Sequence, residues 1–177
     1  MRSAKPHPVS KSSRDAAPAR PFPPYDARRY VVSQSVGHQI VNLMTLMRRE
    51  LETRMAAVGL TDAQWKPLWM LDSGRADTGN EMARCLEMDA GAVTRLLDRL
   101  EAKGLLERTR SEADRRVVRL QLTPAGKAAA VQVPHVLASV NNDFLQGFSE
   151  AEWLQLRALI ERMSANGAAL LAARSAA

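Results

Sequence analysis

The stretch from Thr78 to Gly104 constrains the fold of this chain most, because it places two short amphipathic helices on either side of a tight turn. The run TGNE that begins at Thr78 fits a capping box, which predicts a helix over 79–87. Asp89 can cap a second helix over 90–103, which ends at a glycine. The apolar stripe of the second helix consists of Val93, Leu96, Leu97 and Leu100. Two such helices in succession are typical of a helix-turn-helix.

A β-hairpin is predicted directly after these helices. The segments Leu105–Arg110 and Arg116–Leu122 surround a polar tip, and the second alternates apolar and polar residues. Residues 108–119 carry a net charge of +3, from Arg108, Arg110, Arg115, Arg116 and Arg119 against Glu112 and Asp114. A basic arm of this kind is typical of a wing that reaches DNA phosphates or a narrow minor groove. A solvated turn without a partner is the alternative explanation.

Longer helices are predicted on both sides of this unit. Apolar periodicity and capping residues predict helices over 28–58, 62–73, 124–147 and 150–173. Prolines inside the second and third of these predict a bend or a shifted boundary. We therefore expect a mainly α fold, a winged helix-turn-helix with one β-hairpin wing embedded in a helical dimerisation frame. The residues expected to help form a two-fold interface are Val36, Ile40, Leu156, Leu159 and Met163.

Candidate DNA contacts lie on the face of the 90–103 helix opposite its apolar stripe. Small residues there let the backbone approach base edges, and Arg95 can form two hydrogen bonds with a guanine. With the wing and the start of the preceding helix, the candidates are Thr78, Asn80, Ala90, Gly91, Thr94, Arg95, Arg99, Arg110, Arg115 and Arg116. An ordinary solvated helix face is the alternative for this set.

Composition separates an N-terminal arm from a single domain. Residues 1–24 are rich in proline and carry a net charge of +4 out of +6 for the chain, which predicts a disordered arm, either inert or in contact with DNA phosphates. Residues 25–177 form the expected domain. Within it, we expect 60–123 to be the DNA-binding lobe, and 28–58 with 124–173 to mediate dimerisation.

Other kinds of chemistry find little support in the sequence. Cys85 is the single cysteine and the three histidines are scattered, so neither a disulfide nor a metal site is expected. We see no nucleophile motif or phosphate-binding loop, and expect no enzyme and no cofactor. No apolar run of membrane-spanning length occurs, which favours a cytoplasmic protein.

The runs VTRLLDRLEAKGLLER, ADRR and LTPAG, within about Leu60–Gly126, resemble the MarR family of bacterial regulators. The resemblance implies a homodimer formed by the first helix and the last two. It implies that the helix with Thr94 and Arg95 recognises a palindromic operator in double-stranded DNA, and that Arg116 contacts the minor groove. It also implies a repressor that a small phenolic or aromatic-carboxylate ligand releases.

The ligand site is the least constrained prediction. Trp65, Trp69 and Met70 could stack on an aromatic ring, and a polar stripe could bind its carboxylate, namely His38, Asn42 and Arg49. The alternatives are core packing for the tryptophans, and solvent or the dimer contact for the stripe. The runs VGHQI and QWKPLWML resemble the branch that governs nicotinate-type catabolism, which implies a hydroxylated pyridine carboxylate. The alternative function is that of an activator, or of a regulator that is ligand-independent or responds to oxidation of Cys85.

Overall fold

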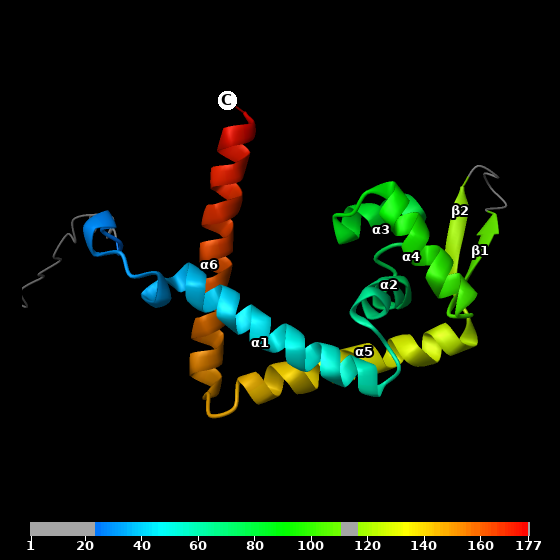
Figure 1. The fold of residues 1–177 in the computed structure, drawn as a ribbon, viewed down its shortest axis with the longest axis horizontal. Coiled ribbons are helices and arrows are strands. Elements are labelled where there is room, and N and C mark those ends of the chain that lie inside the picture. Colours follow the sequence, from blue (N-terminus) through cyan, green and yellow to red (C-terminus); the bar gives the residue numbers. More distant parts are fainter. Residues whose placement is uncertain (1–23, 111–116, 177) are drawn as a thin grey trace, which may run out of the picture. The chain divides into compact units, whose positions relative to one another are not determined.

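The computed structural model describes residues 24–110 and 117–176, which form six α-helices, two short 3₁₀ turns and one β-hairpin (Figure 1). The α-helices are α1 Val36–Ala57, α2 Asp62–Asp72, α3 Gly79–Leu86, α4 Ala90–Ala102, α5 Pro124–Phe144 and α6 Glu150–Ser175. The strands are β1 Leu106–Arg110 and β2 Val118–Leu122. This arrangement confirms the mainly α fold with a single hairpin. The predicted N-terminal arm lies almost entirely outside the described residues.

The described chain falls into two compact units that divide between Ile40 and Val41. In the N-terminal unit, the predicted start of the first helix is wrong. Two short 3₁₀ turns form at Ala27–Arg29 and Val32–Gln34, and α1 begins only at Val36. The Ser35 hydroxyl accepts a hydrogen bond from the His38 N–H at 3.2 Å, so it acts as a helix cap where the sequence pattern predicts a helix interior.

The larger unit is organised around one apolar core. Side chains from successive elements are completely or almost completely buried in it, including Leu68 of α2, Met82 of α3, Leu100 of α4 and Val133 of α5. Helix α2 packs against α5, and α4 packs beside β1. Pro67 is buried within α2, and the helix continues through it.

The start of α5 lies unusually close to the chain that enters β1. The Thr123 hydroxyl accepts a hydrogen bond from the Gly126 N–H at 3.0 Å and donates one to the Gly104 carbonyl at 2.6 Å. The Thr123 N–H donates to the Leu105 carbonyl at 3.2 Å. A Cβ atom at position 126 would lie only 2.8 Å from the Leu105 carbonyl carbon, and closer still to its oxygen. Glycine is therefore required at this position for steric reasons, which explains the last residue of the run LTPAG.

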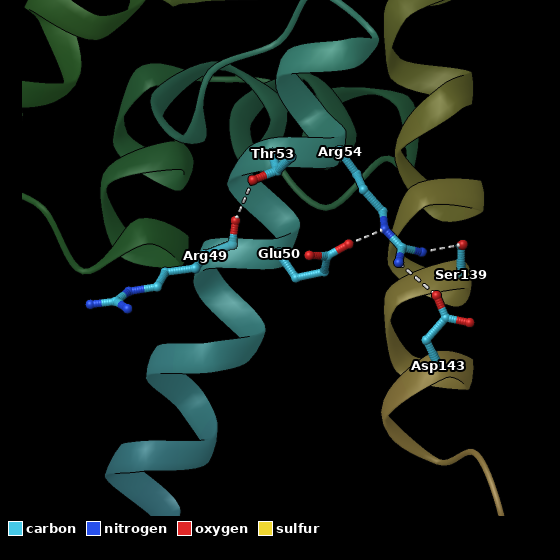
Figure 2. Close-up of polar contacts among 6 residues, drawn as sticks. All are labelled: Arg49, Glu50, Thr53, Arg54, Ser139 and Asp143. Carbon is cyan, nitrogen blue, oxygen red and sulfur yellow. Dashed lines mark hydrogen bonds and ion pairs between the residues drawn. The ribbon is translucent and has the colours of Figure 1, made fainter.

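Arg54 joins α1 to α5 in the larger unit (Figure 2). Its guanidinium donates to Glu50 on its own helix at 2.7 Å, and to Ser139 and Asp143 on α5 at 2.6 Å each. The hydrogen bonds with Asp143 and Glu50 raise the pKa of Arg54. These contacts fix the C-terminal half of α1 beside the C-terminal part of α5.

Helix α6 begins with the predicted capping box. The Ser149 N–H donates to the Glu152 carboxylate at 2.9 Å, and the Glu152 N–H donates to the Ser149 hydroxyl at 3.3 Å. The Ser149 hydroxyl also donates to this carboxylate at 2.7 Å, and this bond, together with the one from the Ser149 N–H, lowers the pKa of Glu152. Within the single chain no residue of the described part of α6 is buried. A helix of 26 residues thus leaves its apolar side chains uncovered.

Candidate nucleic-acid interface

Helices α3 and α4 meet at a tight turn, as the sequence predicts. The Thr78 hydroxyl accepts a hydrogen bond from the Glu81 N–H at 3.3 Å and so caps α3. The second half of the predicted capping box is wrong, because the Glu81 carboxylate accepts from the N–H of Asp77 at 3.0 Å rather than from that of Thr78. That bond with Asp77 lowers the pKa of Glu81. At the turn, Glu87 adopts a left-handed conformation with φ of 52°.

Helix α4 divides into a buried face and an exposed face. Its buried residues are the four predicted ones, Val93, Leu96, Leu97 and Leu100. The candidate DNA contacts on this helix are all exposed, namely Ala90, Gly91, Thr94, Arg95 and Arg99. The Asp89 carboxylate accepts from the Ala92 N–H at 2.8 Å and fixes the start of the helix. The N-terminal turn of α4, which attracts anions through its unpaired N–H groups, therefore lies beside small, exposed side chains.

Two side chains on this face have defined geometry. The Thr94 hydroxyl donates to the Ala90 carbonyl at 2.8 Å, so in this conformation it is left to accept a hydrogen bond, for example from a base amino group. The Arg95 guanidinium extends back toward the helix start, where one of its nitrogens lies 3.5 Å from the position of a Cβ atom at Gly91. No described residue forms an ion pair with Arg95 or Arg99.

The hairpin follows α4 and pairs β1 with β2 in antiparallel register, from Leu106 opposite Leu122 to Arg110 opposite Val118. Arg110 is exposed near the tip. The predicted contacts Arg115 and Arg116 fall outside the described residues. Thr78 is half-buried and bridges to β2, whereas Asn80 is exposed at the start of α3.

Two of the arginines that contribute to the net positive charge of the hairpin are paired inside the lobe. Arg108 of β1 donates to Asp98 and Glu101 of α4 at 2.7 Å each. Arg119 of β2 pairs with Asp77, which precedes α3. The spacing of Asp98 and Glu101 in the sequence is the signal that could have predicted the pairing of Arg108. Two carboxylates one turn apart are unexpected on a helix that faces phosphates, unless a cation of the protein neutralises them.

The predicted ligand residues are not assembled into one enclosed site by the described contacts. The Trp65 indole is buried and its N–H donates to Asp62 at 3.0 Å, which favours the core alternative for this residue. Trp69 and Met70 are half-buried, and the Arg75 guanidinium covers the Trp69 ring at 4.4 Å. Figure 2 shows the Arg49 side chain extending away from α5.

The stripe residues His38 and Asn42 lie on α1 in different units, half-buried and exposed, respectively. A shallow groove of about 540 Å³ lies elsewhere, at the turn between α5 and α6, and contains none of the six predicted ligand residues. In the parts of the chain that the structure describes, no group of three or more potential ligands could hold a metal ion. No described helix is long and apolar enough to span a membrane.

The comparisons with known proteins agree with this geometry. A family model described as "MarR family" matches residues 58–117, which contain α3, α4 and β1. The crystal structure of transcriptional regulator PA3341 is 32% identical, with a TM-score of 0.63, over 75% of this chain and 97% of that chain. The reduced form of MarR from E. coli is 28% identical, with a TM-score of 0.64, over 73% of this chain and 96% of that chain.

A mutant of E. coli MarR complexed with operator DNA is similar to the same extent. It is 28% identical with a TM-score of 0.63, over 72% of this chain and 92% of that chain. The winged helix-turn-helix architecture is therefore confirmed by solved structures, one of which contains DNA.

Proposed function

The chain belongs to the MarR family of DNA-binding transcriptional regulators, and on that premise we propose that two copies of it bind a palindromic operator and repress transcription until a small aromatic carboxylate releases them. Members of this family are regulators rather than enzymes. The operator, the repressor role, the dimer and the effector are the parts that we propose.

The exposed face of α4 is the observation that carries the DNA-contact part of the proposal. Its other face is fixed in the core by four apolar residues, so the helix is held rigidly while its N-terminal half remains accessible. Arg95 can reach a base edge or a phosphate, and Arg99 can reach a phosphate one turn further on. The basic hairpin beside it would bring Arg110 and the tip arginines to the flanking groove.

Uncovered apolar surface supports the dimer. In α6, Leu159, Ile160 and Met163 are between 46 and 52% exposed within one chain. Val36 and Ile40 at the start of α1 are 43 and 37% exposed. A second copy that covers these side chains would form a hydrophobic two-fold interface, and two-fold symmetry of the protein requires a palindromic operator.

The effector is proposed from the family resemblance together with the chemistry of α1 and α2. A planar acid could stack on Trp69 in place of Arg75 and retain that guanidinium as the partner of its carboxylate. Arg49 and Asn42 offer a second set of exposed polar groups on α1. The effector releases DNA only if it binds the DNA-free conformation more tightly than the DNA-bound one. Bound DNA must then lower the affinity for the effector by the same factor.

Selection of duplexes from a random pool by the full chain tests the DNA-binding part. We expect enrichment of a palindrome whose half-sites lie about one helical turn, roughly 10 base pairs, apart. Arg95→Ala should relax the preference at one position per half-site, and Arg116→Ala should weaken binding by about 1–3 kcal/mol at matched salt. The control is Lys66→Gln, which removes one charge from α2. Failure to enrich any sequence would refute the proposal.

Two further measurements separate the remaining parts. Sedimentation at micromolar concentration should give a dimer, and a folded monomer would contradict the interface. Calorimetric titration with hydroxylated pyridine carboxylates and other aromatic acids should show binding that operator DNA weakens. Equal affinity with and without DNA would refute the release mechanism and leave DNA binding intact.

A further inference from the structure

Arg108 connects the wing to the recognition helix with two hydrogen bonds. Its two terminal nitrogens donate to Asp98 and Glu101 at 2.7 Å each. The arginine side chain is only 27% exposed, whereas the two carboxylates are 55 and 41% exposed. An arginine that forms two short, charge-assisted bonds is held in one orientation, which a lysine with a single point charge cannot reproduce.

The charge of this cluster argues against a direct contact with DNA. One guanidinium between two carboxylates leaves a net charge of −1, which repels phosphates. In its observed conformation, the guanidinium of Arg108 is directed to the carboxylates of α4. Its effect on DNA binding must therefore act through the elements that it connects.

Those elements carry the proposed DNA contacts on both sides of the cluster. Alternate residues of a strand share one face, so Leu106, Arg108 and Arg110 lie on the same face of β1. Leu106 is buried in the core and Arg110 is exposed toward the tip. On α4, Asp98 lies three residues after Arg95 and therefore close to it on the helix surface. The hydrogen bond between Arg108 and Asp98 thus fixes the part of β1 that carries Arg110 relative to the part of α4 that carries Arg95.

The second strand is held independently. The Leu120 N–H donates to the Asp77 carbonyl at 2.8 Å, and Arg119 forms an ion pair with the Asp77 side chain. Each strand of the hairpin is consequently attached to a different part of the helix-turn-helix. The base of the wing has little freedom to rotate about α4.

We propose that Arg108 is a positioning residue for operator recognition, which fixes the wing relative to α4 so that both elements engage the operator as one unit. This inference rests on the proposed function, because it assumes that α4 and the wing contact DNA. It also gives Asp98 and Glu101 a role that favours DNA recognition, although their negative charge by itself repels DNA.

Variants that change the charge in opposite directions test this role. Arg108→Gln lowers the net charge by one per chain, whereas the double variant Asp98→Asn with Glu101→Gln raises it by two. Both break the same connection. Lys66→Gln is the control, since it also removes one positive charge, but from an ion pair within a single helix. The measurement is the affinity of the full chain for the selected operator and for a scrambled duplex, over a range of salt concentrations.

A positioning role predicts that both Arg108→Gln and the double variant lower the ratio of operator to scrambled affinity, by about tenfold, the discrimination that one well-placed contact provides. The control should keep the wild-type ratio. The dependence of log affinity on log salt should keep its slope in Arg108→Gln, whereas loss of a phosphate contact would lower the slope by about one unit.

Two results would overturn the inference. If Arg108→Gln weakens both duplexes while the double variant strengthens both, Arg108 acts through its charge alone. If both variants are less stable to urea but keep the wild-type affinity ratio when folded, the cluster only stabilises the lobe. A wild-type chain that does not distinguish operator from scrambled DNA would instead refute the proposed function itself.

Discussion

Replacing Gly126 with alanine should destabilise the protein, although alanine is the better helix former. In an open helix, glycine to alanine stabilises by up to about 1 kcal/mol. At position 126 the added Cβ would lie 2.8 Å from the carbonyl carbon of Leu105, so α5 and the start of β1 must separate. More than about 1 Å of movement is needed, because the Leu105 carbonyl oxygen would lie closer to the added Cβ than the carbonyl carbon does.

That movement has a cost that can be worked out from the contacts. It stretches the bonds from Thr123 to the Leu105 and Gly104 carbonyls, which are 3.2 and 2.6 Å long. Two such bonds contribute about 2 kcal/mol, and strain from overpacking adds about 1–3 kcal/mol. After subtracting the gain in helix propensity, we expect a net loss of about 2–4 kcal/mol.

Urea denaturation at one fixed protein concentration measures this loss, because the stability of a dimer depends on concentration. Gly79→Ala is the matched control, since Gly79 lies in the first turn of α3 and an added Cβ would meet only the Leu97 side chain, at an ordinary contact distance of 3.9 Å. Its stability should be unchanged or higher. A Gly126→Ala protein as stable as the wild type would refute the steric argument.

Three further predictions concern single contacts. Arg54→Met should lower the urea midpoint, with Arg54→Lys restoring only part of it, while Arg49→Met on the same helix serves as the control because its side chain extends away from α5. Glu87→Gly should raise the free energy of unfolding by about 0.5–1 kcal/mol, because glycine tolerates the φ of 52°, and an unchanged value would contradict that. The pKa values of Glu81 and Glu152 are lowered in the folded protein, so their ionised carboxylates stabilise the fold. This contribution is fully present above the ordinary glutamate pKa of about 4.3 and is lost as the pH falls through the lowered values. The double variant Glu81→Gln with Glu152→Gln should therefore lose less stability on acidification than the wild type, and parallel pH curves would exclude this effect.

The helix starts were predictable from the sequence because capping is local. Asp89, Thr123 and Ser149 each accept a hydrogen bond from an N–H three residues further along the chain. A pattern of four residues contains both partners, so it can predict the contact. The start of α1 was placed too early, although the apolar stripe begins only at Val36 and is preceded by Ser35, a residue type that caps helices.

The electrostatic organisation of the lobe was not predictable in this way. Arg108 pairs with Asp98 ten residues earlier, and Arg119 pairs with Asp77, 42 residues earlier. A count of charges in the hairpin treats both arginines as available to DNA. Only the packing of β1 on α4 and of β2 on the start of α3 brings these partners together.

The ligand site shows the same limit. Trp65 has the residue type of an aromatic box, yet its indole N–H is already bound to Asp62. Residue type alone does not show whether a polar atom has a partner within the fold. The six ligand residues and the ten DNA contacts therefore remain predictions that the variants above must test.

Helix α5 is held at both ends, and this gives it the properties of a lever. Thr123 and Gly126 hold its first turn against the DNA-binding lobe, and Arg54 holds Asp143 near its last turn. Its 21 residues span about 32 Å at 1.5 Å per residue. A rotation of about 6° at the Asp143 end would then displace the lobe by about 3.4 Å, the spacing of one base pair along a strand. A small rearrangement around Arg54 would thus be amplified into a mismatch with the operator, without any change inside the lobe.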